Sequence, residues 1–433
     1  MQLYSTNNKS NVVDLKQAVL KSLPADKGLY MPIQIPSIEA EWFQNLNQLT
    51  ITDIAYKIAQ TLIGDYIPTP DLERIVSKAI NFEAPLHYLS DDIASLELWH
   101  GPSLAFKDFG ARFMAQLMSY FNKDENKKLT ILVATSGDTG GAVAAGFLNT
   151  PGIEVIILYP EGKVSHLQEK QLTTLGGNIT ALEIKGTFDD CQALVKTAFL
   201  DADLTKKYNL SSANSINIAR LIPQSFYYVD AYRQVRDKDK SVVVAIPSGN
   251  FGNLTAGLLA QRMGCPIDHF IAATNMNKVV PDYLDTGSYE PKTSVATISN
   301  AMDVGSPSNF TRMQALFDGS HESMSKAISG YSLNDEDTRY MMQEIYTKHD
   351  YIADPHGAIG YGAVEEYLAI NDNYTGIFLE TAHPAKFLDV METTLENIKT
   401  PIPKALANLQ DKKKVSTLLD TDFAGFKSWL MGR

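Results

Sequence analysis

From residue 129 onward the chain alternates short apolar runs with longer runs of helical periodicity, and this alternation restricts the fold more than any other feature. It is typical of βαβ units, in which helices join parallel strands. Several apolar runs lack the polar alternation of a half-exposed strand, so we expect helices on both faces of the sheets. The sequence therefore predicts an α/β fold. The predicted strands are 129–134, 154–159, 179–184, 241–246, 270–274 and 376–380, and the predicted helices are 163–175, 188–200, 216–236 and 254–262.

The first 95 residues follow a different pattern. Helical periodicity covers 13–23, 51–63 and 71–82, and loops that contain proline separate these segments. This part contains no group of residues that indicates chemistry, so we expect a packing domain that is mostly helical. A chain of 433 residues is also too long for one small core. Two or three domains are therefore expected.

Composition excludes several classes of partner. The formal net charge is -12, whereas a protein that binds nucleic acid or an anionic membrane needs a basic face. A small anionic substrate stays compatible, because a local site can oppose the global charge. Cys191 and Cys265 lie far apart without metal-ligand spacing, which fits a reducing compartment. We find no signal-like start and no apolar run that is long enough to span a bilayer, so a cytoplasmic protein is expected.

Lys107 occupies an unusual place for a lysine. Gly101-Pro102-Ser103 supplies a turn and an N-cap, and the helix that follows has an apolar face made by Phe106, Phe109, Phe113, Leu117 and Phe121. In the first turn, the helix dipole and the aromatic surface both disfavour an ammonium ion. Such a lysine is suited to form a Schiff base with an aldehyde, above all with pyridoxal phosphate. A solvated lysine at a helix end is the alternative.

Two loops that directly follow predicted strands are rich in glycine. In the loop 134–141, small residues and hydroxyls at a helix start can direct amides toward an anion such as a carboxylate. A turn that is merely well capped has the same composition, so both interpretations stay open. In the loop 247–253, Gly249 and Gly252 permit a positive φ and the close backbone approach that a bound phosphate requires. The P-loop and dinucleotide-binding patterns are absent from this loop. An anchoring phosphate, as in a cofactor, fits it best.

A third segment, 214–220, combines an expected helix N-cap with Arg220 one turn later. A forked guanidinium together with hydroxyl groups can hold a second phosphate, which would belong to the substrate. A capped helix with a solvated arginine explains the segment equally well.

Eight segments, in order along the chain, resemble motifs of the threonine synthase family, whose members are pyridoxal-phosphate enzymes with the tryptophan-synthase β (type II) fold. The segments are HGPSLAFKDFGARFMAQLM, ATSGDTGGAV, LQEKQLTTLGGNI, NSINIAR, PSGNFGNLTAG, SNAMDVGSPSNF, DPHGAIGY and TAHPAKF. The resemblance extends from the YSTNNK and GLYMP segments near the start to near the C-terminus. It implies two open, twisted, mainly parallel α/β domains and an N-terminal, mostly helical domain. The expected division is 1–95 for the N-terminal packing domain, 96–125 with 238–433 for the large cofactor-binding domain, and 126–237 for the small domain.

The resemblance also implies roles for residues around a pyridoxal 5'-phosphate cofactor. Lys107 matches the lysine that forms the Schiff base and later moves protons. Thr381 matches the hydroxyl that faces the pyridine nitrogen. The cofactor-phosphate loop is matched by Gly249, Asn250, Phe251, Gly252 and Asn253.

Asp138 departs from the wider fold type, which usually has an asparagine beside the phenolic oxygen of the cofactor. The branch of threonine synthases that this chain resembles has aspartate at this position. Two interpretations stay open for Asp138, namely a cofactor neighbour and a plain helix N-cap.

For the substrate, the resemblance implies two binding groups. Ser136 and Thr139 match the loop that holds the substrate carboxylate, and Ser215, Asn217 and Arg220 belong to the segment associated with the substrate phosphate. The implied reaction converts O-phospho-L-homoserine and water to L-threonine and phosphate by γ-elimination and β-addition, without a metal. The enzyme would be a lyase of threonine biosynthesis. Neither a nucleic acid nor a membrane is an expected partner, and the chain is expected to be a monomer or a homodimer.

Two other functions stay open. A serine or threonine dehydratase, or a lyase of related phosphorylated amino acids, shares the cofactor chemistry, but a dehydratase would not need the basic helix start at Arg220. A catalytically silent relative would only bind a phosphorylated metabolite. Lys107 together with both glycine loops argues against the silent relative.

Overall fold

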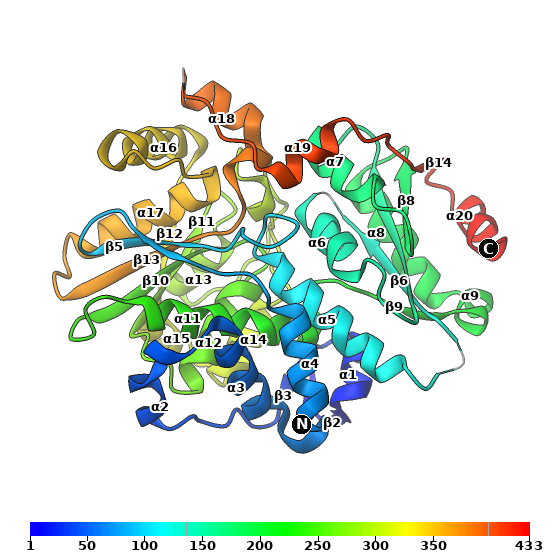
Figure 1. Ribbon diagram of the computed structural model, residues 1–433, viewed down its shortest axis with the longest axis horizontal. Coiled ribbons are helices and arrows are strands. Elements are labelled where there is room, and N and C mark those ends of the chain that lie inside the picture. Colours follow the sequence, from blue (N-terminus) through cyan, green and yellow to red (C-terminus); the bar gives the residue numbers. More distant parts are fainter. Residues whose placement is uncertain (126, 136, 397) are drawn as a thin grey trace.

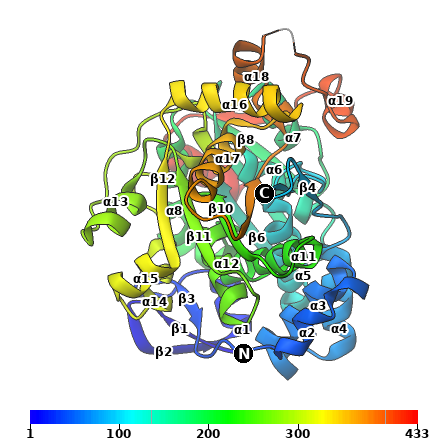
Figure 2. The ribbon, with the colours of Figure 1, turned by 90° about the vertical axis from the view of Figure 1, so that its left-hand side faces the viewer.

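The computed structural model describes residues 1–125, 127–135, 137–396 and 398–433. Figure 1 shows two sheet-containing lobes side by side above a layer of N-terminal elements, with helix α5 (Lys107–Asn122) running between the lobes. Figure 2 shows the same N-terminal elements, in blue, gathered at the bottom of the molecule. The fold class agrees with the sequence prediction, because both large sheets are mainly parallel and covered by helices.

The N-terminal region contains a small sheet that the sequence analysis missed. It has the order β2-β1-β3 and is antiparallel, with strands β1 (Gln2–Ser5), β2 (Asn8–Asp14) and β3 (Tyr30–Pro32). Strand β2 has the sequence NKSNVVD and lies mostly in solvent, so it lacks the apolar alternation that indicates a strand. The helices here are α1 (Leu15–Lys21), α2 (Ala40–Gln44), α3 (Ile51–Ile63) and α4 (Thr69–Ala79).

The larger sheet has the strand order β12-β11-β10-β13-β5-β4. Its strands are β4 (Leu86–Tyr88), β5 (Ile93–Glu97), β10 (Ser241–Pro247), β11 (His269–Thr274), β12 (Ile328–Ser332) and β13 (Tyr374–Glu380). All neighbours are parallel except the pair β4 and β5. On one face of β10, Val244 belongs to the same core as Leu254 of α12 (Gly252–Arg262), and on the other face Val243 belongs to the same core as Ile359 of α17 (Pro355–Leu368). Burial on both faces explains why β10 reads as a continuous apolar run.

The smaller sheet has the order β14-β8-β7-β6-β9 and is parallel throughout. Its strands are β6 (Leu129–Ala134), β7 (Ile153–Pro160), β8 (Ile179–Ile184), β9 (Asn209–Ser211) and β14 (Thr417–Leu419). Leu132 belongs to the same core as Leu194 of α8 (Phe188–Leu200), whereas Ile131, on the opposite face, belongs to the core that includes Val143 of α6 (Asp138–Phe147).

Sheet membership differs from the predicted division of the chain in two places. Strand β14 pairs with β8, and α20 (Phe423–Met431) packs on the same sheet, although residues 238–433 were assigned to the large domain. Strands β4 and β5, which lie mostly before residue 96, belong to the larger sheet. In both places the strand pairs with a partner far away in the sequence, which the local pattern does not reveal.

The predicted apolar face of α5 is confirmed, since Phe109, Phe113 and Leu117 are fully buried and Phe121 nearly so. The predicted helix 216–236 is divided at Pro223 into α10 (Ile218–Leu221), a 3-10 helix (Ile222–Ser225) and α11 (Phe226–Gln234). The other α-helices are α7 (His166–Thr173), α9 (Ala202–Lys207), α13 (Val279–Thr286), α14 (Phe310–Leu316), α15 (His321–Ala327), α16 (Asp335–His349), α18 (Leu388–Thr394) and α19 (Lys404–Gln410). Short 3-10 helices occupy Leu46–Gln48, Gly64–Tyr66, Asn300–Met302 and Pro384–Phe387, and the last of these is η5. In the part of the chain that the structure describes, every helix is too short or too polar to cross a membrane.

Candidate active site

The loop before α5 is held beside the chain that follows β13. Strands β5 and β13 are parallel neighbours, and the backbone amides of Leu98 and Phe106 donate hydrogen bonds to the carbonyls of Glu380 (3.0 Å) and Thr381 (2.9 Å). Ala105 and Ala382 form an isolated bridge in the same stretch. Lys107, the first residue of α5, therefore lies next to Thr381 at the carboxyl ends of the strands. Ligand sites in open α/β sheets gather at this edge.

The expected N-cap at Ser103 is wrong. Helix α5 begins after Phe106 without a side-chain cap, whereas the backbone amide of Ser103 donates to Asp108 Oδ2 at 2.8 Å. Asp108 is fully buried, and this burial raises its pKa to about 6 although the hydrogen bonds from Ser103 act against the shift.

A cluster of one carboxylate and two lysines surrounds the end of the Lys107 side chain. Lys107 Nζ lies 3.6 Å from Asp138 Oδ2, and Lys386 Nζ lies 2.6 Å from Asp138 Oδ1. Gln168 Nε2 also donates to Asp138 Oδ1, at 2.9 Å. The interpretation of Asp138 as the helix N-cap is wrong, because Gly137 occupies that position and Asp138 is the first helical residue. Its carboxylate is bound by side chains of the cluster instead.

Sequence reasoning missed Lys386. The TAHPAKF motif contains it, but the residue has no periodicity or spacing that separates it from a surface lysine. In the structure its side chain is 0% exposed. Complete burial of a lysine requires a partner, and Asp138 is that partner.

Electrostatics distinguishes the members of this cluster. Burial has the largest effect on Lys107 and lowers its pKa. The Asp138 carboxylate acts against this shift, whereas the charges of Lys386 and Arg220 add to it. For Asp138, burial alone would raise the pKa, but the charges of Lys386 and Lys107 outweigh it and hold the pKa well below the usual range. Asp138 is therefore a carboxylate at neutral pH, and Lys107 loses its proton more easily than an ordinary lysine.

The loop 247–253 leads into α12 with an unusual backbone. Neither Gly249 nor Gly252 has a positive φ, so that expectation is wrong, and Phe251 takes the left-handed conformation instead, with a φ of 58°. Gly249 is needed for close approach, since a Cβ there would lie 2.8 Å from Cα of Met302. Phe251 is the N-cap and makes no side-chain capping bond. The first amides of α12 are therefore available to an anion.

Asn250 ties this loop to two others. Its Nδ2 donates to Ser215 Oγ at 2.9 Å, and its Oδ1 accepts from the amide of Ser308 at 2.6 Å. Asn309 Nδ2 donates to the carbonyl of Asn250 at 3.0 Å. The expected cofactor-phosphate loop and the expected substrate-phosphate segment are thus directly bonded.

Asn253 is held by two buried tyrosines. The hydroxyls of Tyr227 and Tyr228 both donate to its Oδ1, and burial raises the pKa of each tyrosine well above its usual value. Within the described residues, Asn253 Nδ2 is buried and has no hydrogen-bond partner. This is a buried donor in the first turn of α12 that a ligand oxygen can satisfy.

Arg220 is not a solvated arginine, since it is only 2% exposed. Its Nη1 donates to the carbonyl of Ala213 at 2.8 Å, and among the described residues its buried Nε has no partner. Burial lowers the pKa of Arg220 to about 10, so the group stays charged at neutral pH. The close contact with Gly110, where a Cβ would lie 3.1 Å from Nε, places Arg220 against the second turn of α5.

The N-cap of this segment is Asn217, one residue after the predicted helix start at residue 216, and its Oδ1 accepts from the amide of Ala219 at 2.9 Å. Its Nδ2 donates to the carbonyl of Val19 and to Ser22 Oγ, both at 2.8 Å. This amide fastens the loop before α10 to the end of α1.

The loop 134–141 is partly capped by its own threonine. Thr135 Oγ1 accepts from the amides of Gly137 (3.1 Å) and Gly140 (2.9 Å). Thr139 is half-buried in the first turn of α6. Ser136 lies outside the described residues.

These features fit pyridoxal phosphate. Lys107 supplies an amine with a lowered pKa, the start of α12 supplies uncapped amides, and Asn253 Nδ2 is a buried donor without a partner among the described residues. Close packing at Gly249 leaves no room for a side chain in the loop. In the described ranges, no group of three or more His, Cys, Asp or Glu side chains is arranged to hold a metal ion.

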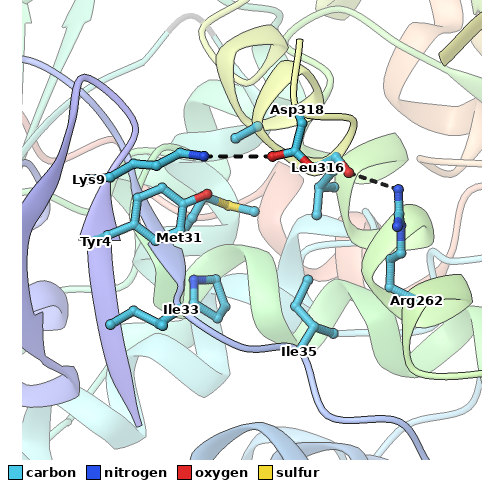
Figure 3. A pocket seen from close by; sticks show the side chains of 10 residues that line it. Tyr4, Lys9, Met31, Ile33, Ile35, Arg262, Leu316 and Asp318 are labelled. Atoms are coloured by element: carbon cyan, nitrogen blue, oxygen red, sulfur yellow. Dashed lines mark hydrogen bonds and ion pairs between the residues drawn. The ribbon is translucent and has the colours of Figure 1, made fainter. Parts of the chain in front are cut away.

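A separate hollow of about 560 Å³ lies between the N-terminal sheet and helices α12 and α14 (Figure 3). Tyr4, Lys9 and Asp318 line it together with Arg262, the last residue of α12. Because α12 has 11 residues, its two ends are about 15 Å apart. This hollow is therefore distinct from the cluster around Lys107.

Three family models match the chain. They are described as threonine synthase N terminus (residues 2–80), pyridoxal-phosphate dependent enzyme (89–375) and threonine synthase, C-terminal (357–429). The chain is 45% identical over 432 residues to the threonine synthase of Haemophilus influenzae, with 100% of both chains covered. It is 44% identical over 432 residues to that of Escherichia coli, with 100% of this chain and 99% of the relative covered.

Solved structures give the same result. The crystal structure of threonine synthase from Escherichia coli matches with a TM-score of 0.91 at 43% identity, and 100% of both chains are covered. A threonine synthase from Brucella melitensis, described as PLP bound, matches with a TM-score of 0.94 at 32% identity, with 100% of this chain and 99% of the other covered.

Proposed function

Since the chain belongs to the threonine synthase family, we propose that it converts O-phospho-L-homoserine and water to L-threonine and phosphate at the site around Lys107. Membership of the family makes it a pyridoxal-phosphate-dependent lyase of threonine biosynthesis. The observation that carries the assignment of the site is that Arg220 lies close enough to Lys107 to act on its pKa, while Ser215 of the same segment is bonded to Asn250 in the loop before α12.

The cofactor would be held by residues from three parts of the fold. When bound, pyridoxal phosphate supplies an aldehyde that links to amines and a ring that withdraws electrons from the attached carbon. Lys107 would be the amine that anchors it, and Thr381 would supply a neutral hydroxyl for the ring nitrogen. The phosphate would rest on the amides of Gly249, Asn250, Phe251, Gly252 and Asn253.

Lys107 is also the proposed base. Because its pKa is lowered by burial, the amine gives up and takes back a proton more readily than an ordinary lysine. We assign to it the removal of the proton on the substrate Cα and the return of a proton there at the end. Asp138 stays ionised, with its Oδ2 3.6 Å from the Lys107 amine.

Arg220 and Ser215 are the proposed holders of the substrate phosphate. The guanidinium of Arg220 is buried and donates from Nη1, but its Nε has no partner among the described residues. A phosphate oxygen would accept a hydrogen bond from that Nε. Ser215 Oγ is positioned by Asn250, and Asn217 holds the loop in which Ser215 lies. These groups would also stabilise the phosphate as it leaves. Ser136 and Thr139 are the proposed holders of the substrate carboxylate.

A dehydratase with the same cofactor is the second candidate, and the buried Arg220 disfavours it. An enzyme for unphosphorylated serine or threonine has no need of a buried guanidinium beside the reacting amine. The silent relative is disfavoured by Lys107, since its lowered pKa is of use to a reacting amine rather than to a passive binder.

We also propose a cytoplasmic location without a nucleic-acid or membrane partner. The net charge of -12 supports the second part, and the free buried thiols of Cys191 and Cys265 are compatible with a reducing compartment.

The reaction is tested by measuring both products in the same tube. The chain is supplied with pyridoxal phosphate and O-phospho-L-homoserine, and phosphate and threonine are quantified together, with Lys107→Ala as the negative control. Equal amounts of both products are expected. Phosphate with 2-oxobutyrate in place of threonine would indicate a lyase without controlled hydration, and neither product would indicate the silent relative.

A further inference from the structure

Lys386 is a second lysine in the cluster around Lys107, and the proposed reaction assigns no role to it. It lies in η5, which begins at Pro384. His383 is the N-cap, and its Nδ1 accepts a hydrogen bond from the amide of Ala385 at 3.1 Å. The side chain is fully buried. Its Nζ contacts Asp138 Oδ1 at 2.6 Å and donates to the carbonyl of Ser103 at 3.0 Å. This lysine is thus fixed by two acceptors from different segments.

Lys107 contacts the same carboxylate less well. Its Nζ lies 3.6 Å from Asp138 Oδ2, which is too long for a good hydrogen bond. Its side chain is also 17% exposed, whereas that of Lys386 is 0% exposed. The ion pair with good geometry is therefore the one between Asp138 and Lys386.

The count of charges leads to the same conclusion. The charged groups around Lys107 come from three elements besides its own helix, namely Asp138 of α6, Lys386 of η5 and Arg220 of α10. Asp108 of α5 accepts from the amide of Ser103 and also interacts with the charges of Lys386 and Arg220. The two carboxylates can balance Lys386 and Arg220, so a third buried cation at Lys107 would be uncompensated.

We propose that Lys386 is a positioning residue that carries the ammonium charge opposite Asp138 and thereby leaves Lys107 as a free amine able to react. This inference rests on the proposed role of Lys107. If Lys386 is removed, Asp138 becomes an unpaired buried carboxylate whose nearest cation is Lys107. Lys107 would then keep its proton to balance Asp138. Asp138 and Lys386 thus act together on the pKa of Lys107. Removing Lys386 alone should raise that pKa, and removing Asp138 as well should cancel the change.

The test measures the protonation of Lys107 without turnover. The full chain is stripped of cofactor and treated with acetic anhydride at a series of pH values, and acetylation of Lys107 is quantified by mass spectrometry. Only the free amine reacts, so the midpoint of the rate profile reports its pKa. The variants are Lys386→Met, Lys386→Arg, Asp138→Asn and the double variant Lys386→Met with Asp138→Asn.

We expect Lys386→Met to raise the midpoint by about one pH unit or more, which is about a tenfold loss of free amine near neutral pH. Lys386→Arg keeps the charge and should stay close to the wild type. The double variant removes both the cation and the carboxylate that it balances, so its midpoint should fall back toward the wild-type value. A residue that only supports the Ser103 loop would not be rescued by Asp138→Asn.

Lys414→Met is the control, since Lys414 is an ion-paired lysine outside the cluster, with Nζ 2.6 Å from Glu169 and 2.7 Å from Glu183. It should leave the Lys107 midpoint unchanged. If the wild-type midpoint is low and Lys386→Met does not move it, the inference is overturned and the role of Lys107 stands. If Lys107 titrates as an ordinary lysine in the wild type, both the inference about Lys386 and the proposed role of Lys107 are overturned. Thermal unfolding of every variant identifies any that do not fold, and Lys386→Arg with the double variant keeps the test decisive in that case.

Discussion

At the scale of single residues, the site depends on charges that are buried before any substrate arrives. Arg220 is nearly inaccessible to solvent and is bonded at only part of its guanidinium. Burying such a charge costs desolvation free energy, and this cost is offset only where a partner or a ligand forms hydrogen bonds with the group. A multiply charged phosphate is the ligand that compensates most fully, because several forked hydrogen bonds become available to it.

The role of Arg220 predicts a selective loss of activity. Arg220→Ala should lower kcat/KM for O-phospho-L-homoserine by about a hundredfold or more, because a charge-assisted contact to phosphate is lost. The cofactor should stay bound, since the loop 247–253 is untouched. Steady-state kinetics and the visible absorbance of the bound cofactor measure the two effects separately.

Arg112→Ala is the control for this prediction, because Arg112 lies on α5 but donates to the carbonyls of Ala79 and Lys78, away from the site. It should lower stability and leave kcat/KM unchanged. If Arg220→Ala turned over the substrate as fast as the wild type, the assignment of the phosphate group would be wrong.

Asp108 predicts a dependence of stability on pH. Its pKa is raised from 3.8 to about 6 in the folded chain, so the folded state holds a proton that the unfolded state has released between these values. Stability therefore falls as pH rises from about 4 to about 6, and the total loss from this group is about 3 kcal/mol.

Asp108→Asn removes this titration and keeps the shape of the side chain. Relative to the wild type, the variant should gain stability across the same pH range and keep a constant difference above it. Urea unfolding at pH 4, 5, 6 and 7 measures the difference. A difference that does not change with pH would show that the buried carboxyl is not protonated in the folded chain.

At the scale of elements, several local signals were sufficient. Helix α3 begins and ends at the predicted residues, because Thr50 and Asp53 form a capping box in front of an apolar stripe. Strands β6 and β8 also have their predicted bounds, since β6 is buried throughout and β8 at all but one position. These elements are determined by residues that are close together in the sequence.

Other features required the tertiary structure. The strand β2 is polar because it lies at the edge of the small sheet, and Lys386 becomes a site residue only when η5 is placed beside α6. The loop before α12 was predicted to turn at its glycines, but the left-handed residue is Phe251. A non-glycine residue in this conformation is held by its surroundings, and Phe251 is 2% exposed.

Gly249 gives a prediction at the same scale. A Cβ at this position would lie 2.8 Å from Cα of Met302 and 2.9 Å from the carbonyl of Ala301, so Gly249→Ala must displace the 3-10 helix Asn300–Met302 or the loop itself. We expect the affinity for pyridoxal phosphate to fall by about tenfold or more, since amides at a helix start bind an anion only when they are aligned. Titration of the stripped chain with the cofactor, followed by absorbance, measures this.

Gly432→Ala is the control, because the nearest atom to its Cβ would be 3.5 Å away and the residue is exposed at the C-terminus. It should bind the cofactor as the wild type does. Wild-type affinity in Gly249→Ala would contradict the assignment of this loop to the cofactor phosphate.

At the scale of the whole molecule, Arg312 of α14 connects the N-terminal sheet to the site. It is fully buried, and its Nη2 donates both to the carbonyl of Tyr30 in β3 (3.0 Å) and to that of Ile216 in the substrate-phosphate segment (2.7 Å). Its Nη1 donates to Asn309 Oδ1 at 2.8 Å, and Asn309 in turn bonds Asn250. Burial lowers the pKa of Arg312 to about 9. The N-terminal region is therefore joined through one side chain to both of the expected phosphate loops.

This connection predicts that Arg312→Met weakens folding and catalysis together. Removing the guanidinium leaves three acceptors without their donor, two of them buried, so the free energy of unfolding should fall by about 3 kcal/mol or more. Because Ile216 lies next to Ser215, kcat/KM should also fall, even though Arg312 is not assigned any contact with substrate. Urea unfolding and steady-state kinetics on the same preparations measure both.

Arg262→Met is the control, since Arg262 donates to a single carbonyl, that of Leu316, at the surface hollow in Figure 3. It should change stability by no more than about 0.5 kcal/mol and leave kcat/KM unaltered. A loss of stability in Arg312→Met without any loss of kcat/KM would mean that the N-terminal region supports the fold but does not position the site.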